Sequence, residues 1–270
     1  MGLSVRTYLG DSEEENFVLQ SFHRACGGIL TTLDEYKPSD IAVVFGTFKK
    51  RVPRSFARGA VIERQKECGQ TIILETGYIN RGSGKSNHYA VGLNGINGRA
   101  DFRNKNSPQD RIEKLGVSLS EWKSGHHIVL CGQVPWDASV DFTDHEKWLL
   151  ETAKSIRLKT SRPIIFRPHP LCKLKPISGT IYSTRPLEKD LKDAHACITF
   201  NSNAGVESVV HGIPAFAFDL GSMVYEVASH SLDELESPEK PDRSQWLADL
   251  TYAQWMPEEF GEAWQHFKLT

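Results

Sequence analysis

The sequence contains no long hydrophobic run. No apolar stretch of its 270 residues approaches the roughly 18–20 residues that a membrane-spanning helix needs. The first sixteen residues, MGLSVRTYLGDSEEEN, lack the apolar core of a signal peptide. Arg6 stands where an N-myristoylation motif requires Ser or Thr. We therefore expect a soluble, cytoplasmic protein.

Cysteine is scarce, with five residues and no pair at CxxC spacing. An odd count without paired spacing argues against a disulfide framework and against a zinc site. Some of these cysteines lie in apolar runs such as HIVLC and HACITF, where a free thiol packs as a small hydrophobic side chain. The sequence also has no metal-binding DxD motif, so we expect an activity that needs no metal.

The stretch GYINRGSGKSNHY (77–89) contains Gly-Lys-Ser, the typical end of a phosphate-binding P-loop, but it lacks the beginning. A P-loop requires another Gly five residues before the second one, and Ile79 occupies that position. The residues that follow, NHYAVGLNGINGRADFRN, are rich in Gly and Asn and show no helical period. We interpret the whole region as a flexible, basic loop.

Short apolar runs alternate with helical patterns along most of the chain. This alternation predicts βαβ units and parallel sheets, hence an α/β fold. Two groups of such units, separated near Trp122–Gly125, predict domains over 1–125 and 126–250, with 251–270 as a helix packing back on the body. The expected strands are 41–45, 71–75, 127–133, 163–170, 196–200 and 214–218, and the clearest expected helix is 145–159.

Polar segments follow three predicted strands, and ligands of open α/β sheets bind at the carboxyl ends of strands. In FRPHPL, Arg167 and His169 lie in an extended turn that projects both side chains to one side. Arginine can clamp a phosphate with two hydrogen bonds, and histidine can add another. The alternative is a rigid, proline-stiffened turn that binds nothing.

The second segment, NSNAG (201–205), joins a strand to a helix. Asn and Ser can cap the helix, and its exposed N–H groups would favour an anion. The small residues would let a ligand approach, and Glu207 could bond a ribose hydroxyl or support the cap. An ordinary capped βαβ unit is the alternative.

The third segment is GQVPWDAS (132–139), where Gln133 and Asp137 follow a strand. Asp137 could act as a base or stabilise a developing cation, or it could simply stabilise a turn.

Charge is unevenly distributed. Residues 41–110 contain twelve Lys or Arg against five Asp or Glu, and residues 226–270 contain three against ten. The basic segment indicates an anionic partner, and a mixed solvated surface is the alternative.

The pattern RPHP, then a strand, NSNAGVE, a helix and GIP, resembles the capsule polysaccharide synthesis family, which includes Kdo transferases. A closer resemblance is to short phage-encoded proteins of this superfamily, which share runs similar to ETGYINR, HYAVGLNGINGRADF and GQVPWDAS. The resemblance covers about residues 70–220. Full capsule transferases are longer, so the acceptor half is trimmed here.

The resemblance implies a GT-B fold, with two Rossmann-like domains facing a cleft. It also implies a nucleotide sugar as co-substrate, with no other cofactor. Asp137 and Glu75 are the predicted catalytic carboxylates, with Asp101 as a third candidate. The predicted donor-binding residues are Gln133, Arg167, His169, Asn201, Ser202, Asn203, Gly205 and Glu207.

The predicted acceptor is a hydroxymethylated base in phage DNA, which would place the protein in the host cytoplasm. The alternatives are a capsule or lipopolysaccharide glycan, and a non-catalytic module that binds polyanions. DNA would require a cationic surface. Phe48, Tyr78, His88 and Tyr89 are predicted either to stack on an extruded base or to pack in the core. The predicted acceptor-binding residues are Lys49, Lys50, Arg51, Arg81, Lys85, Arg99 and Arg103, and Arg54, Arg58 and Lys105 belong to the same basic segment.

Overall fold

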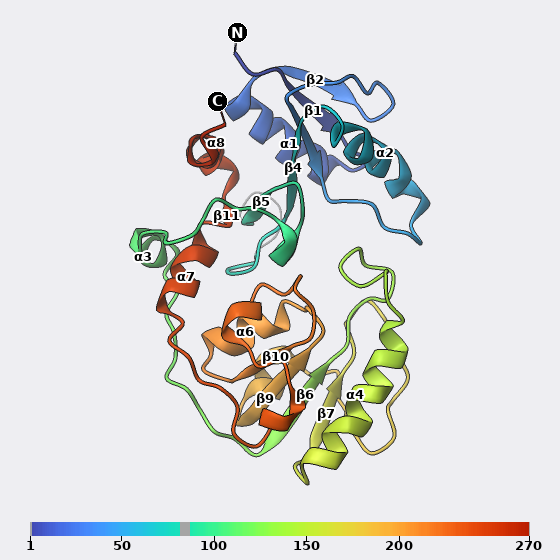
Figure 1. Ribbon diagram of the computed structural model, residues 1–270, viewed down its shortest axis with the longest axis vertical. Helices are drawn as coiled ribbons and strands as arrows, with labels where there is room; N and C mark the ends of the chain where they lie inside the picture. The colour runs from blue at the N-terminus through green and yellow to red at the C-terminus, as the bar shows by residue number, and fades with distance from the viewer. Residues whose placement is uncertain (1, 82–86, 270) are drawn as a thin grey trace. The chain divides into compact units, whose positions relative to one another are not determined.

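A computed structural model describes residues 2–81 and 87–269 (Figure 1). The chain forms two compact units, one of residues 1–115 and 247–270 and the other of residues 116–246. The chain first passes from one unit to the other at Leu115–Gly116, upstream of the Trp122–Gly125 boundary expected from the sequence. The C-terminal segment returns to the unit that contains the N-terminus.

The N-terminal unit contains a six-stranded sheet with the order β11-β5-β4-β3-β1-β2. The pairs among β1, β2, β3 and β4 are parallel, and β5 runs antiparallel to both β4 and β11. The strands are β1 (Val5–Leu9), β2 (Ile29–Thr32), β3 (Ile41–Phe45), β4 (Gln70–Thr76), β5 (Tyr89–Leu93) and β11 (Gln254–Trp255).

Helices cover both faces of this sheet. On one face, α1 (Glu13–Cys26) and α8 (Phe260–Phe267) share a core with the strands, and the Phe22 and Phe260 rings meet edge to face at 5.3 Å. On the other face, α2 (Phe56–Gln65) contributes Val61 and Ile62 to a separate cluster. The C-terminal helix thus packs against the N-terminal one (Figure 1). Two further helices are α3 (Asp110–Leu115) and α7 (Ser244–Thr251).

Strand β5 corrects the sequence prediction, which treated this region as a loop. All five of its residues are buried, because it lies between two other strands. A Cβ at Gly92 would come within 2.7 Å of the Ala100 side chain, since the chain folds back closely at this point. The glycine that suggested a loop thus permits close packing inside the sheet.

The second unit contains a fully parallel sheet with the order β10-β9-β6-β7-β8. Its strands are β6 (His127–Cys131), β7 (Ile164–Arg167), β8 (Ile181–Tyr182), β9 (Ala194–Thr199) and β10 (Ala215–Ala217). The chain places β7 on one side of β6 and later places β9 on the other side. The strand order therefore reverses between β6 and β9, and ligands of such sheets bind at this kind of switch point.

Helices also cover both faces of the second sheet. One core contains α4 (His145–Lys159), and the other contains residues of α5 (Leu187–Leu191) and α6 (Ala204–Val210). Strand β3 and helix α4 have the boundaries expected from the sequence, 41–45 and 145–159. Their pattern is clear because β3 is buried on both faces and α4 has one buried stripe.

All five cysteines are free thiols. Cys131 and Cys197 lie in the core of the second unit with their sulfurs 3.8 Å apart. The described helices include none with the length and apolar character of a membrane span. Across residues 2–81 and 87–269, no group of three or more His, Cys, Asp or Glu side chains is arranged to hold a metal ion.

Candidate functional site

The carboxyl ends of β6, β7 and β9 carry the three segments that the sequence singled out. Because β6 lies between β7 and β9 in a parallel sheet, these segments meet at one edge of the second unit. Gln133 follows β6, Arg167 ends β7, and Asn201 follows β9. The structure therefore brings the predicted donor residues to the switch point of the sheet.

Gln133 and Asn201 hold each other across this switch point. The Gln133 Nε2 donates to Asn201 Oδ1 at 2.7 Å, and the Asn201 backbone N–H donates to Gln133 Oε1 at 3.1 Å. Both residues are buried. Their amides are therefore committed to joining two strand ends, although the sequence assigned them to donor contacts.

The same network reaches the predicted catalytic Asp137. Asn201 Nδ2 donates to the Ser139 carbonyl and to Asp219 Oδ2, both at 2.7 Å. The Ser139 backbone N–H and hydroxyl both donate to Asp137 Oδ1, at 3.0 and 2.9 Å. The half-buried Asp137 carboxylate is thus oriented through Ser139 by a buried amide network.

His145 supports the network from the first turn of α4. Its Nε2 accepts the Gln133 backbone N–H at 2.9 Å, so a neutral ring carries its proton on Nδ1. Burial lowers the pKa of His145 to about 4, and its ring stacks on Trp148 at 5.4 Å. The histidine is therefore a fixed, neutral acceptor under the β6 end.

Arg167 is anchored by a buried carboxylate. Its Nη1 donates to Asp190 Oδ2 at 3.2 Å and to the Arg185 carbonyl. Asp190 is completely buried and also accepts from Ser183 and Arg185. The guanidinium is consequently held at the end of β7.

A backbone hydrogen bond defines the tautomer of the neutral His169 ring. Its Nδ1 accepts the Leu171 backbone N–H at 3.2 Å, which in the neutral ring places the proton on Nε2. A half-buried N–H donor therefore stands beside Arg167 in the RPHP turn.

The start of α6 differs from the sequence prediction in its details. Ser202 Oγ accepts the Ala204 N–H at 3.3 Å, while the Asn203 side chain forms no cap bond to the helix. A Cβ at Gly205 would lie 2.9 Å from the Val224 side chain. A larger residue at this position would press against Val224, so packing is one reason for a glycine there. Glu207 lies half-buried in the first turn.

In the N-terminal unit, the predicted catalytic Glu75 lies near the carboxyl end of β4. Its carboxylate accepts the Thr76 backbone N–H at 3.1 Å and is half-buried. The third candidate, Asp101, pairs with Arg103 at 2.8 Å on the surface.

The basic segment divides into exposed and buried residues. Arg58 is buried and pairs with Glu15 at 3.0 Å, so it is unavailable to a nucleic acid and the prediction that it contributes to a cationic surface is wrong. Lys49 is half-buried, and Lys85 lies outside the described residues. The exposed members are Lys50, Arg51, Arg54, Arg81, Arg99, Arg103 and Lys105.

The interleaved aromatic residues also divide. Tyr78 and Tyr89 are 4 % and 1 % exposed, so they pack in the core and cannot stack on an extruded base. Phe48 is exposed and lies against Phe56, with ring centroids 5.7 Å apart. His88 is half-buried, and burial lowers its pKa.

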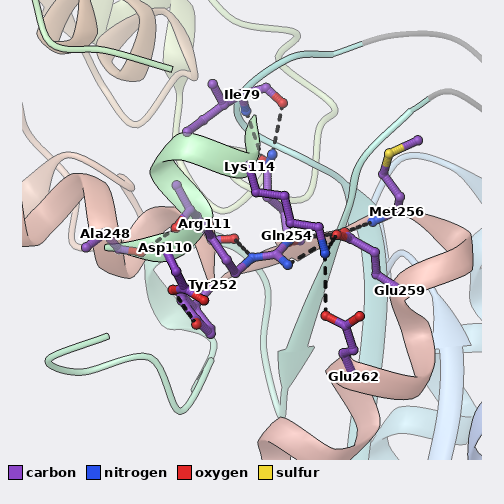
Figure 2. A network of polar contacts seen from close by, with 11 residues as sticks. Ile79, Asp110, Arg111, Lys114, Ala248, Tyr252, Gln254, Met256, Glu259 and Glu262 are labelled. Carbon is purple, nitrogen blue, oxygen red and sulfur yellow. Dashed lines mark hydrogen bonds and ion pairs between the residues drawn. The ribbon is translucent and has the colours of Figure 1, made fainter. Parts of the chain in front are cut away.

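Hydrogen bonds hold the first residues of the GYINR stretch in place, which corrects their interpretation as part of a flexible loop. Gln254 Oε1 accepts the N–H groups of Tyr78 and Ile79, at 2.6 and 2.9 Å, and its Nε2 donates to the Ile79 carbonyl at 3.0 Å. Arg111 holds the Gln254 carbonyl at 3.0 Å and pairs with Glu259 at 3.1 Å (Figure 2). The C-terminal segment therefore fixes the chain that follows Glu75.

Several residues of these networks carried no assignment from the sequence. A strand-end position could have indicated Asp219, which follows β10. Ser139 has a local partner in Asp137, and Asp190 has local partners in Ser183 and Arg185. The partners of His145 and Gln254 lie further along the chain, and no local pattern reveals them. The residues without an assignment are Ser139, His145, Asp190, Asp219 and Gln254.

Comparisons with solved structures place the fold. The chain resembles the β-Kdo 2,7 transferase of Thermosulfurimonas dismutans KpsC, with a TM-score of 0.58, 15 % identity and coverage of 98 % of this chain and 100 % of that one. It also resembles the β-Kdo 2,4 transferase of the same protein, with a TM-score of 0.60, 12 % identity and coverage of 93 % and 89 %. The chain therefore has the α/β architecture of GT-B glycosyltransferases. No protein-family profile matches the sequence, and no curated protein matches it.

Proposed function

We propose that the protein is a glycosyltransferase that moves a sugar from a nucleotide-sugar donor to an acceptor hydroxyl. The observation that carries this proposal is the set of polar residues at the switch point of the second sheet. Asp137 follows β6, Arg167 and His169 lie at the end of β7, and the Gln133–Asn201 bridge joins the ends of β6 and β9. The GT-B architecture supports it, because both neighbours are named as sugar transferases.

The donor is assigned to the second unit. A departing nucleoside phosphate develops negative charge, which an arginine and an imidazole N–H can stabilise. Arg167 and the His169 Nε2–H supply these groups at the end of β7, with Ser202 and Asn203 after β9 on the other side of β6. In this proposal Gln133 and Asn201 hold the ends of β6 and β9 together.

We assign removal of the proton from the acceptor hydroxyl to a carboxylate. General bases must lie within hydrogen-bond reach of the proton they remove. Asp137 follows β6 and Glu75 lies near the carboxyl end of β4, the ends of parallel strands where ligands bind. Asp137 has two fixed donors on one oxygen, which keeps its second oxygen in a defined direction. The proposed chemistry uses no metal.

A glycan is the favoured acceptor. Both structural neighbours are named as Kdo transferases, and the structure removes Arg58, Tyr78 and Tyr89 from the predicted DNA surface. Modified phage DNA remains a second candidate, since exposed cations of the basic segment, such as Arg51 and Arg54, would suit it.

One mass-spectrometric screen tests these assignments. The protein is incubated with a panel of nucleotide sugars, including activated Kdo, and with glycan, plain DNA and hydroxymethylated DNA. A sugar-sized mass gain on the glycan that is lost in Asp137→Ala supports the proposal. Gain on hydroxymethylated DNA alone would select the second acceptor. If no donor binds or is consumed, the proposal fails and a non-catalytic polyanion-binding module takes its place.

A further inference from the structure

Glu15 and Arg58 form an ion pair that the proposed function does not use. Glu15 lies in the first turn of α1 and Arg58 near the start of α2, and these helices cover opposite faces of the N-terminal sheet. Glu15 Oε2 accepts from Arg58 Nη2 at 3.0 Å and from the Asp11 N–H at 3.2 Å. The pair therefore spans the carboxyl edge of the sheet.

Two glycines make room for this pair. A Cβ at Gly10, after β1, would lie 2.3 Å from Glu15 Oε2. Gly46, after β3, has φ +69°, and its Cβ would lie 3.0 Å from Arg58 Nη1. Both strand ends therefore lack side chains where the ion pair lies over them.

The same point above Gly46 faces Glu75. The Cβ that Gly46 lacks would lie 3.6 Å from Glu75 Oε2, as well as 3.0 Å from Arg58 Nη1. The Arg58 guanidinium and the Glu75 carboxylate thus border one small space at the ends of β3 and β4. Arg58 is 8 % exposed, so water screens its charge only weakly.

We propose that Arg58, held in place by Glu15, is a positioning residue for Glu75, whose ionised carboxylate its guanidinium stabilises. This inference rests on the proposed function, in which Glu75 is a candidate to receive the acceptor proton. An opposite charge nearby favours the ionised form of a carboxylate, and only that form can accept a proton. Glu15 balances Arg58 and fixes its position, because a buried guanidinium requires a partner.

Other charged and titratable groups near Glu75 act in known directions. Tyr78 follows β4, and its pKa is raised mainly by burial and further by the Glu75 charge, so it is neutral at ordinary pH. Arg81 acts on Tyr78 in the opposite direction. Removal of the Arg58 cation and removal of the Glu15 anion should act on Glu75 in opposite directions.

The test follows the Glu75 carboxyl directly, without substrate. The full chain is labelled with 13C at glutamate carboxyls, and the Glu75 signal is identified by its absence in Glu75→Gln. We expect the titration midpoint to rise by about one pH unit in Arg58→Gln and to fall in Glu15→Gln. Arg58→Lys keeps the charge and should restore most of the wild-type midpoint.

Matched controls separate this effect from general changes of charge or stability. Lys66→Gln and Glu63→Gln remove the members of an exposed ion pair near the end of α2, and neither should move the midpoint. If Arg58→Gln does not fold, the comparison of Glu15→Gln with Glu15→Gln/Arg58→Gln measures the same difference without leaving an unpaired buried charge.

The outcomes distinguish the inference from the proposed function. Equal midpoints in wild type and Arg58→Gln, or shifts in the same direction for both variants, overturn the role of Arg58. Absence of transfer by the wild-type protein overturns the proposed function and leaves the titration result standing. Where transfer is found, the acid limb of its pH profile should shift with the Glu75 midpoint.

Discussion

Gln133 and Asn201 exchange two hydrogen bonds across the ends of β6 and β9, one between side chains at 2.7 Å and one from the Asn201 backbone at 3.1 Å. These two bonds join the ends of β6 and β9, the two strands between which the strand order reverses. Because Asn201 also holds Ser139, which orients Asp137, the bridge connects the architecture of the sheet to the proposed chemistry.

Asn201→Asp should destabilise the second unit. The substitution removes both Nδ2 donors and places a carboxylate 2.7 Å from Asp219 Oδ2. We expect a loss of about 1–3 kcal/mol in the free energy of unfolding at neutral pH, measured by urea denaturation. Asn201→Asp/Asp219→Asn should recover part of this loss, because the pair again has a donor and an acceptor. A double variant no more stable than Asn201→Asp would contradict the importance of this contact.

Ser139→Ala tests the orientation of Asp137. The variant keeps the backbone donor and removes the hydroxyl donor at 2.9 Å. If Asp137 is catalytic, kcat should fall about tenfold with little change in the KM for the donor, since one hydrogen bond to a charged group contributes about 1.5 kcal/mol. Ser139→Thr retains the hydroxyl and serves as the control. An unchanged kcat in Ser139→Ala would show that the hydroxyl does not matter.

His169→Ala tests the donor site. Loss of the Nε2–H should weaken binding of the nucleotide sugar about tenfold, measured by calorimetry, because a hydrogen bond to a charged phosphate is lost. Leu171→Ala is the matched control, since Leu171 lies two residues away and is 81 % exposed. Equal donor affinity in His169→Ala and wild type would exclude His169 from the site.

Glu259 should make stability depend on pH at acidic values. Burial alone would raise its pKa, but hydrogen bonds from Arg111 and Lys114 outweigh that effect and lower it from 4.5 to about 2. The stabilising contribution is therefore complete above about pH 4.5 and is lost as the pH falls towards 2. Glu259→Gln should flatten this part of the curve of unfolding free energy against pH. A curve with the wild-type slope would contradict the assignment.

His145 should make stability depend on pH in a higher range than Glu259 does. Burial lowers its pKa from 6.5 to about 4, so the unfolded chain binds a proton more readily than the folded one. Stability should consequently decline as the pH falls from about 6.5 to 4. His145→Phe retains a ring against Trp148 and removes both the titration and the acceptor for the Gln133 N–H. We expect about 1–3 kcal/mol lower stability at pH 7 and a flatter pH dependence, measured by denaturant unfolding.

The amount of the fold that the sequence predicts depends on how local each signal is. IAVVF and HEKWLLETAKSIRLK gave β3 and α4 with correct ends, because continuous apolar runs and helical spacing are local patterns. Strand β5 (YAVGL) was missed because its glycine suggested a loop. Gly92 allows close packing against Ala100, and this contact exists only in the folded chain. Likewise Arg58 looks like a surface cation until its partner Glu15, distant in sequence, is known.

The sequence by itself determined that the chain is α/β and that polar residues follow β6, β7 and β9, since both depend on patterns within short segments. Only the tertiary structure decided what those residues do. Strand order set Gln133 beside Asn201, and packing of distant segments tied Arg167 to Asp190 and Gln254 to the GYINR stretch. Hydrogen bonds and ion pairs between residues far apart in the chain require particular distances and directions, which no spacing along the sequence specifies.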